Sequence, residues 1–444
     1  MNSFYKNFIL IALPMAFQNL VTTSVSLIDN LMIGRLGDVA IASVGLANKV
    51  FFIYVLVIFG LCSGASAFIA QFWGKEDLKG IKQVVFINTL VALSVSFVFA
   101  IFGFFMPTHI MTLLTDDKEV IFEGAKYLKI ISPSFILVSI IHVCSYTLKT
   151  LEHPKIPLFA SLISIIINAF LNYILIFGKL GAPRLGVSGA AFATLSARIF
   201  EMLFIVLATR KKLTFLFYGI SHLKDIKKDF LKSFFIKVIP VILNETMWSL
   251  ATTMMVSIYA RISTQAVAAV NVITILRDLT SVFFIGAGNA AAVSIGKLIG
   301  LKKYDEAYER TYQLSIYVPI FAGIFGLLTL LVSKNFIGLF NISVETFNIA
   351  NSLYITAVIF MPFASFNHLN ICGSLRAGGD SFYCLVSDAG SIWAVGVFGS
   401  FISGTVFGLP ILYVYIISRC EEILKAILLF IRIKKRKWIK DLVN

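Results

Sequence analysis

Residues 50–74 have the sequence VFFIYVLVIFGLCSGASAFIAQFWG, which contains no Asp, Glu, Lys or Arg. A bilayer core about 30 Å thick is crossed by a helix of roughly 20 apolar residues, so this stretch predicts a transmembrane helix. Four further runs are also free of charge: 84–106, 156–178, 312–333 and 347–375. Seven more carry one or a few charges: 7–34, 128–148, 186–209, 234–260, 265–296, 382–403 and 406–430. The sequence therefore predicts twelve spans.

The composition of the whole chain agrees with this prediction. Apolar residues make up 58% of the 444 residues, charged residues only 14%, and the mean hydropathy is +0.90. Soluble domains carry about 25% charged residues, because their surfaces must be hydrated. A soluble protein is thereby excluded. The apolar runs are also too long for the strands of a β-barrel and do not alternate with period two. The predicted fold class is an all-α membrane protein.

The positive charges give the orientation. One set of alternate loops, with Arg376 among its members, contains twenty-four Lys and Arg residues, and the other set contains seven. Since Lys and Arg concentrate in cytoplasmic loops, we expect a multi-pass protein of the cytoplasmic (inner) membrane with both termini in the cytoplasm. The net charge of +15 falls on these loops, so no nucleic-acid partner is expected. The basic tail around Trp438 is expected to contact anionic lipid.

The two halves of the chain resemble each other. Residues 13–74 align without a gap to residues 239–300, which places Pro14 on Pro240 and Gly60 on Gly286. The predicted domains are an N-terminal lobe of six helices at 1–209, a basic cytoplasmic linker at 210–233 and a C-terminal lobe at 234–444. Because six spans is an even number, the six-helix bundles would be related by a pseudo-two-fold axis along the membrane normal. This geometry is typical of a rocking transporter.

Enzyme motifs are absent from the sequence. It contains no HExxH, no Walker loop and no serine-centred elbow, and Gly286-Ala287-Gly288 lies inside a span, where glycines serve helix packing. The five cysteines lie in apolar stretches without metal-ligand spacing. We therefore expect neither an enzyme nor a cofactor.

Three segments carry a family resemblance. Pro14 is followed fifteen residues later by Asp29 in LPMAFQNLVTTSVSLIDNLMIGRLG (13–37), GLCSGASAFIAQFWG occupies 60–74, and GSLRAGGD occupies 373–380. They resemble the first, second and tenth helices of the multidrug and toxic compound extrusion (MATE) transporters, in particular the bacterial NorM-like branch. The resemblance covers essentially the whole chain. It implies a secondary active exporter of twelve helices.

Asp29 is the first candidate coupling residue, because an ionisable side chain within a span is a functional hypothesis by default. Asn168 and Asn172 are spaced i, i+4 and share one helical face, and Thr194 lies in a stretch (GAAFAT) that resembles the family's. Together they offer only oxygen ligands, which suits Na⁺, whereas a proton would need Asp29 alone. There are two structural alternatives. Asp29 could cap the next helical turn at the membrane interface, and the two amides could serve only to hold helices together.

Glu245 is the second candidate and matches the family's helix-7 glutamate. It follows Pro240, and the neighbouring sequence offers it no compensating charge except Lys237 near the membrane edge. Trp248, one turn onward, is expected either beside a cleft for aromatic cations or facing lipid. Pro14 and Pro240 each remove a backbone hydrogen bond, so helix bending is expected there.

Among the other charges within the spans, five lie in the runs 186–209, 265–296 and 382–403. Arg198 and Glu201 are spaced i, i+3 and are expected to pair, while Arg277 and Asp278 are expected to point apart and Asp388 to stand alone. Their roles, structural or functional, stay open.

The predicted function is efflux of small amphipathic, cationic organic compounds by a monomeric antiporter that uses a Na⁺ or H⁺ gradient. A flippase for lipid-linked saccharides, from the related superfamily, is the nearest alternative, although such flippases have a more cationic cleft. A channel or membrane receptor is the alternative from another class. A channel would show conductance without coupled counterflow.

Overall fold

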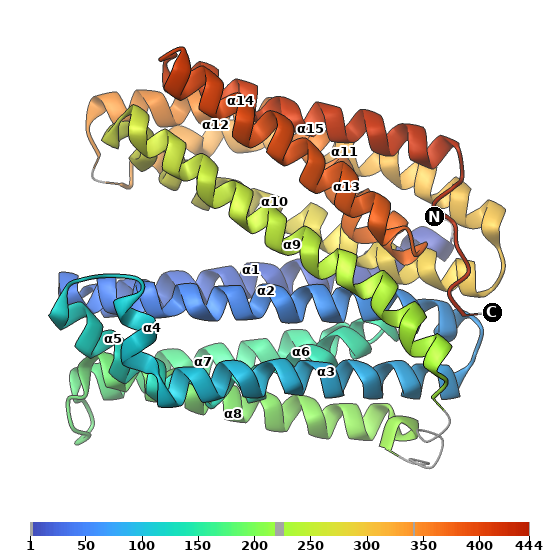
Figure 1. Cartoon of the computed structure of the whole chain (residues 1–444), viewed down its shortest axis with the longest axis horizontal. Coiled ribbons are helices and arrows are strands. Elements are labelled where there is room, and N and C mark those ends of the chain that lie inside the picture. The colour runs from blue at the N-terminus through green and yellow to red at the C-terminus, as the bar shows by residue number, and fades with distance from the viewer. Residues whose placement is uncertain (1–2, 218–225, 341, 444) are drawn as a thin grey trace. The chain divides into compact units, whose positions relative to one another are not determined.

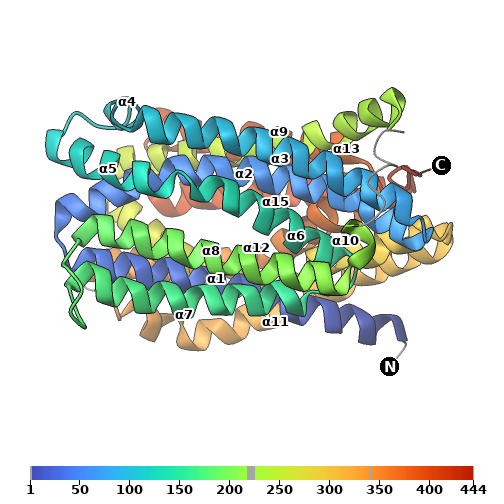
Figure 2. The ribbon, with the colours of Figure 1, turned by 90° about the horizontal axis from the view of Figure 1, so that it is seen from below.

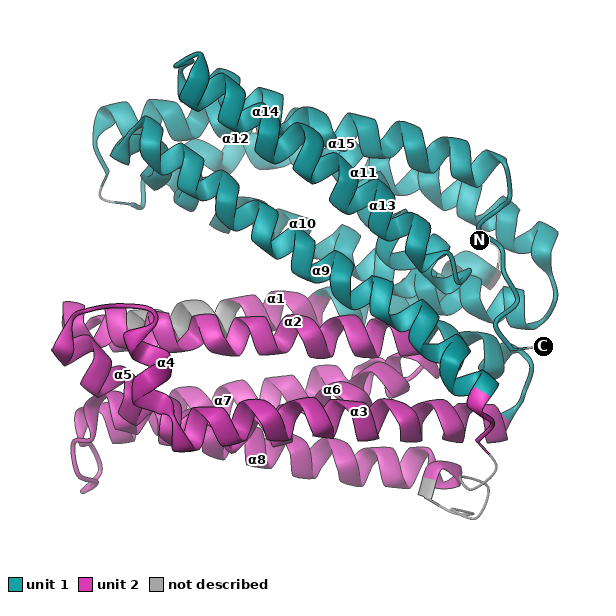
Figure 3. Ribbon diagram, in the orientation of Figure 1, with its two compact units in different colours: residues 1–16, 66–77, 229–444 teal, residues 17–65, 78–228 magenta. Residues whose placement is uncertain are grey.

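The computed structural model describes residues 3–217, 226–340 and 342–443, apart from the side chains of residues 3, 24–28, 30 and 31. The chain forms two compact units (Figure 3). Unit 1 comprises Met1–Ala16, Ser66–Asp77 and Asp229–Asn444, and unit 2 comprises Phe17–Ala65 and Leu78–Lys228. Helices α1 (Ser3–Gly34) and α2 (Asp38–Gly74) contribute residues to both units.

Unit 2 is built around the pair formed by α7 and α8, which run side by side (Figure 1, Figure 2). Gly189 allows this close approach, because a Cβ atom there would lie 2.6 Å from the carbonyl oxygen of Leu175. On the other side of the unit the Tyr54 hydroxyl of α2 donates to the Phe135 carbonyl at 2.5 Å. The helices that lie wholly in this unit are α3 (Leu78–Phe105), α4 (Pro107–Thr112), α5 (Lys118–Ile131), α6 (Ser134–Thr150), α7 (Lys155–Phe177), α8 (Gly186–Lys212) and η1 (Thr214–Phe217).

Unit 1 is built around α10. Small residues let its neighbours approach: a Cβ atom at Gly286 would lie 2.8 Å from the Ala12 carbonyl oxygen, and one at Gly373 would lie 2.7 Å from the Gly288 carbonyl oxygen. These contacts confirm that Gly286 and Gly288 serve helix packing. The elements of this unit are α9 (Lys228–Ile262), α10 (Thr264–Gly300), α11 (Tyr304–Ile337), α12 (Val344–His368), η3 (Leu369–Leu375), α13 (Ser381–Ser391), η4 (Ile392–Val397), α14 (Phe398–Phe401), η5 (Ile402–Val406) and α15 (Ile411–Lys434).

The helices follow the twelve predicted apolar runs. Within the described residues, nine helices are long and apolar enough to cross a membrane, and the pair α5 and α6, bent by 50° at its break, forms a tenth. The bend falls where Pro133 caps the start of α6, as expected for a residue without a backbone N–H. The remaining two runs form α1, parts of which lie outside the described side chains, and α15, which carries buried charges.

The internal repeat extends to the helix boundaries. Helices α2 and α10 are each 37 residues long, and their first and last residues differ by the same offset of 226 that aligns the sequences. Helices α3 and α11 begin at Leu78 and Tyr304, which have this offset too. Pro14 and Pro240 lie inside α1 and α9, in equivalent places.

The predicted linker at 210–233 is shorter in the structure. Helix α8 continues to Lys212 and α9 begins at Lys228, because both helices extend past their apolar runs into the basic flanks. Residues 218–225, the middle of this linker, lie outside the described residues. Met1–Ala16 and Ser66–Asp77 group with unit 1 although both come from the N-terminal half. The lobe boundaries at 209 and 234 stay predictions.

The C-terminal tail folds back onto unit 1. Trp438 is fully buried and lies against Gly378, where a Cβ atom would come within 2.6 Å of the indole ring. Lys440 pairs with Asp380, and the Gln71 amide donates to the Lys440 carbonyl at 3.1 Å. The Trp438 ring is therefore buried within the protein, because the glycines of the GSLRAGGD segment leave room for it, while the expected contact of the basic tail with anionic lipid stays a prediction.

Removing the Trp438 ring is expected to loosen the end of unit 1. Trp438→Ala should reduce the free energy of unfolding by about 3 kcal/mol, at the low end for a buried tryptophan because a cavity near the chain end can relax. Unfolding of the purified protein in mixed micelles measures this loss. Trp248→Ala, at a tryptophan that is 38% exposed, is the matched control and should change stability much less. Equal losses in the two variants would contradict a structural role for the tail.

Candidate functional site

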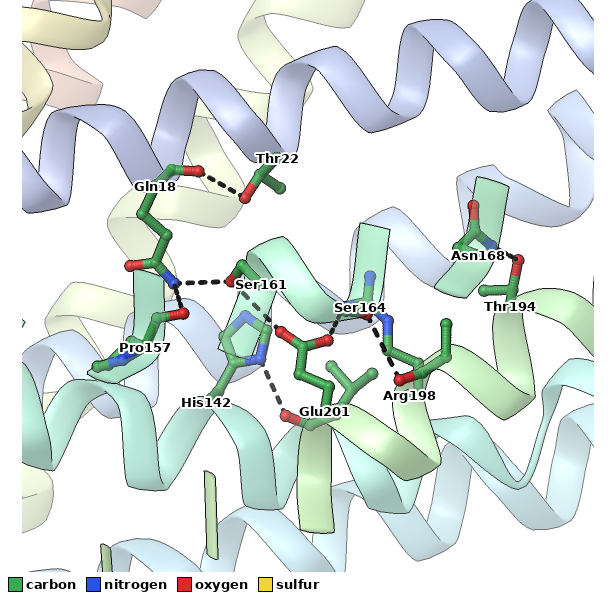
Figure 4. Close-up of polar contacts among 12 residues, drawn as sticks. Gln18, Thr22, His142, Pro157, Ser161, Ser164, Asn168, Thr194, Arg198 and Glu201 are labelled. Atoms are coloured by element: carbon green, nitrogen blue, oxygen red, sulfur yellow. Dashed lines mark hydrogen bonds and ion pairs between the residues drawn. The ribbon is translucent and has the colours of Figure 1, made fainter. Parts of the chain in front are cut away.

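In unit 2 the four predicted residues form one hydrogen-bonded chain. The Asn172 amide nitrogen donates to Asp29 Oδ1 at 2.6 Å and to Asn168 Oδ1 at 3.1 Å. The Asn168 amide nitrogen donates to Thr194 Oγ1 at 3.2 Å (Figure 4). The sequence prediction that these side chains come together is confirmed, although their use by a cation stays a prediction.

The local sequence explains this arrangement. The i, i+4 spacing puts both amides on the face of α7 that packs on α8, and the close contact at Gly189 brings Thr194 of α8 into reach. Asn168 and Asn172 are both buried. Within the described part of the chain, the Asn172 carbonyl oxygen has no hydrogen-bond donor. A buried acceptor without a donor is costly, so this oxygen is suited to a cation or a donor from outside the chain.

A second polar network lies next to this chain, on the same helix pair (Figure 4). Arg198 pairs with Glu201 at 2.6 Å, as the i, i+3 spacing predicts. Ser161 donates to Glu201 at 3.3 Å, and Gln18 of α1 donates to Ser161 at 3.1 Å. The buried Glu201 carboxylate is thus charge-compensated, which makes a structural role sufficient for it.

In unit 1 Glu245 has an ion-pair partner. Arg376 Nη2 lies 2.9 Å from Glu245 Oε1, and Arg376 is 1% exposed. Two sequence predictions are therefore wrong: Glu245 does not lack a compensating charge, and Arg376 is not a loop charge. Arg376 follows η3, a π-helical stretch that continues α12, and such stretches are frequent at functional sites.

Asp388 does not stand alone either, so that prediction is wrong. Lys425 of α15 lies 2.8 Å from Asp388 Oδ1 and 2.5 Å from Glu421 Oε2. The Asn244 amide of α9 donates to Asp388 Oδ2 at 3.0 Å. Elements that are remote in sequence thus bring acids and bases together inside unit 1.

The chain is similar to known transporters along most of its length. A family model described as MatE matches residues 14–174 and 238–402, which is most of the chain. This chain belongs to the MatE family. The transporter named "Uncharacterized transporter YisQ" from Bacillus subtilis (strain 168) is 24% identical over 93% of this chain and 90% of its own length. The "Probable multidrug resistance protein YoeA" of the same organism is 25% identical over 93% and 90%.

Solved structures agree with this MatE assignment. A crystal structure of a mutant of the Vibrio cholerae MATE transporter VcmN covers 99% of this chain and 98% of its own chain, with a TM-score of 0.90 and 18% identity. At this identity the likeness concerns the fold alone. It confirms the predicted fold class, an all-α membrane protein of the MATE type. The chain is a multi-pass transporter of the MatE family.

Two other predictions for this MatE protein have different outcomes. Arg277 and Asp278 pair with each other at 3.2 Å and do not point apart, because the long Arg277 side chain curls back to its neighbour. Trp248 is 38% exposed. Its role beside a substrate stays a prediction.

The sequence reasoning missed several residues of the MatE fold. Tyr127 of α5 lies beside Asp29 and Thr194, and Gln18 links α1 to Ser161. The apolar run that forms α15 contains several charged residues, and this density of charge was a signal that the sequence offered for a buried network. Tyr127 had no such signal, since tyrosine is common in spans.

Proposed function

We propose that this MatE-family transporter exports small amphipathic organic compounds, cationic ones among them, in exchange for Na⁺ or H⁺. The hydrogen-bonded chain that ends on Asp29 carries this proposal. Asp29 supplies a carboxylate within a span, and the buried Asn172 carbonyl oxygen beside it lacks a donor among the described residues. Hard cations prefer such oxygen ligands, so Na⁺ is the ion that this group favours. A proton on Asp29 is the other candidate.

Switching between states would start at Asp29. Neutralising its carboxylate removes the charge that the Asn172 amide stabilises, which changes the contact between α1 and α7. Pro14 lies in the same helix, and the boundary between the two units crosses α1 just beyond it, at Ala16 and Phe17. A helix lacking one backbone hydrogen bond bends at low cost at that point, and Pro240 of α9 is equivalent.

The proposed substrate class rests on the exposure of Trp248 and on the names of relatives. Trp248 is exposed enough for an aromatic ring to stack on it, and several relatives are named "Probable multidrug resistance protein". Because Arg376 compensates Glu245, Glu245 offers less attraction for a cation than its sequence context suggests. We propose a monomer in the inner membrane with both termini in the cytoplasm. Apart from its substrates and the coupling ion, its only partner would be membrane lipid.

Transport by the purified protein in liposomes tests the proposal. An imposed Na⁺ gradient is expected to drive counterflow of a fluorescent organic cation, and a pH gradient at equal Na⁺ is expected to drive it less. The measurement is dye movement with each gradient alone and with none. Conductance without coupled counterflow would instead indicate a channel. Movement of a lipid-linked saccharide without either gradient would indicate a flippase.

A further inference from the structure

Two carboxylates share one ammonium group inside unit 1. Lys425 Nζ contacts Asp388 at 2.8 Å and Glu421 at 2.5 Å, and the side chains of Lys425, Asp388 and Glu421 are 4%, 11% and 3% exposed respectively. With both acids ionised this triad carries one net negative charge. An uncompensated charge in a buried site is costly, and binding of one cation or proton removes it.

The charged neighbours of the triad are engaged elsewhere. Glu422 accepts from the Asn367 amide at 2.7 Å, Arg419 lies over the Tyr415 ring at 5.0 Å, and Arg376 pairs with Glu245. The groups that face the triad come from every packed element that the structure describes. They are Asn244 and Glu245 of α9, His368 of α12, Cys372 of η3, Arg376 after it, Cys384 of α13, and Arg419 and Glu422 of α15. The four acids among all these charges outnumber the three bases, so the excess charge persists in the wider group.

A neighbouring amide indicates that the missing partner is a proton. Asn244 is 2% exposed, and its carbonyl oxygen has no donor among the described residues while its nitrogen donates to Asp388. A protonated Asp388 becomes a donor, and a rotated Asn244 amide would accept from it with the same oxygen that now lacks a donor. The oxygen that now lacks a donor thereby gains one in the protonated state, while the amide nitrogen gives up its bond to Asp388.

We propose that Asp388, Lys425 and Glu421 form a proton-binding site that holds one proton between the two carboxylates. Without the proton, Lys425 bridges both acids and holds α13 to α15. Uptake of one proton neutralises one carboxylate, and Lys425 then pairs with the other alone. Gly396 of the π-helical η4 lies against Glu421, so this rearrangement occurs beside an irregular helix. The use of the proton in antiport rests on the proposed function, whereas the binding of the proton does not.

Infrared difference spectroscopy of the purified protein at two pH values tests the site, because the carbonyl stretch of a protonated carboxyl group is visible directly. The variants are Glu421→Gln and Asp388→Asn. Each is made in an Asp29→Asn background, so that a carboxyl group at position 29 cannot contribute to the spectrum. Either substitution leaves one acid paired with Lys425. Each substitution is therefore expected to abolish the carbonyl-stretch signal of the shared proton. It is also expected to lower proton uptake by about one proton per molecule, because the two acids titrate as a pair.

Glu422→Gln is the matched control, since it makes the same chemical change at the next residue, and it should retain the signal. A titrating signal that survives in either Glu421→Gln or Asp388→Asn would overturn the proposal. If one variant fails to fold, the other still decides. With Asp29 intact, normal Na⁺-driven efflux by Glu421→Gln and Asp388→Asn, together with loss of the infrared signal in the Asp29→Asn background, would leave the proton site standing and separate it from coupling. Failure of all gradient-driven efflux with intact signals would overturn the proposed function only.

Discussion

Asp29→Asn is expected to abolish cation-driven efflux while the protein stays folded and inserted. The substitution keeps the size of the side chain and removes its charge, and its amide oxygen can still accept from Asn172, as Asp29 now does at 2.6 Å. A site without its carboxylate no longer compensates a monovalent cation. Counterflow in liposomes and the amount of protein in the membrane fraction measure the two parts of this expectation.

Asp116→Asn is the control for the substitution at Asp29. Asp116 lies exposed in the loop between α4 and α5, where loss of one carboxylate should leave counterflow unchanged. Asn172→Asp tests the same site in the other direction, since a second carboxylate beside Asp29 should strengthen cation binding. Efflux at the level of the parent protein by Asp29→Asn, at equal expression, would remove Asp29 from the coupling mechanism.

The sequence predicted the spans and the unit 2 site for physical reasons. Span lengths follow from bilayer thickness, which is the same for every helix of the chain. The Asn168 and Asn172 spacing defines a helical face by itself, and one acid in a span needs partners nearby. These arguments use residues close in sequence and hold for α7. The partnership of Asp29 with Asn172, which lies 143 positions away, came from the family resemblance instead.

The network of unit 1 could not be predicted in the same way. Glu245 and Arg376 are separated by 131 positions, and Asn244 and Asp388 by 144. Arg376 stands beside small and polar residues at the end of an apolar run, a context typical of a cytoplasmic loop. Only the packing of η3 against α10, made possible by Gly373, takes it into the interior.

Arg376→Met is expected to destabilise the protein by about 4 kcal/mol, because it leaves the Glu245 carboxylate buried without its counter-charge. Glu245→Gln should cost less, since the guanidinium keeps an oxygen acceptor of the same shape. Unfolding in mixed micelles measures both losses. Each variant should be compared at equal expression and in the same detergent.

The double variant Glu245→Gln with Arg376→Met distinguishes an ion pair from two independent side chains. Removing both charges also removes the penalty that Arg376→Met alone imposes, so the double variant is expected to be more stable than Arg376→Met by about 2 kcal/mol. Asp278→Asn with Arg277→Met, at a pair that is 50% and 32% exposed, is the matched control and should show coupling below about 1 kcal/mol. Additive losses at Glu245 and Arg376 would show that their contact does not hold unit 1 together. Glu245 would then be free to attract a cationic substrate, as its sequence context first indicated.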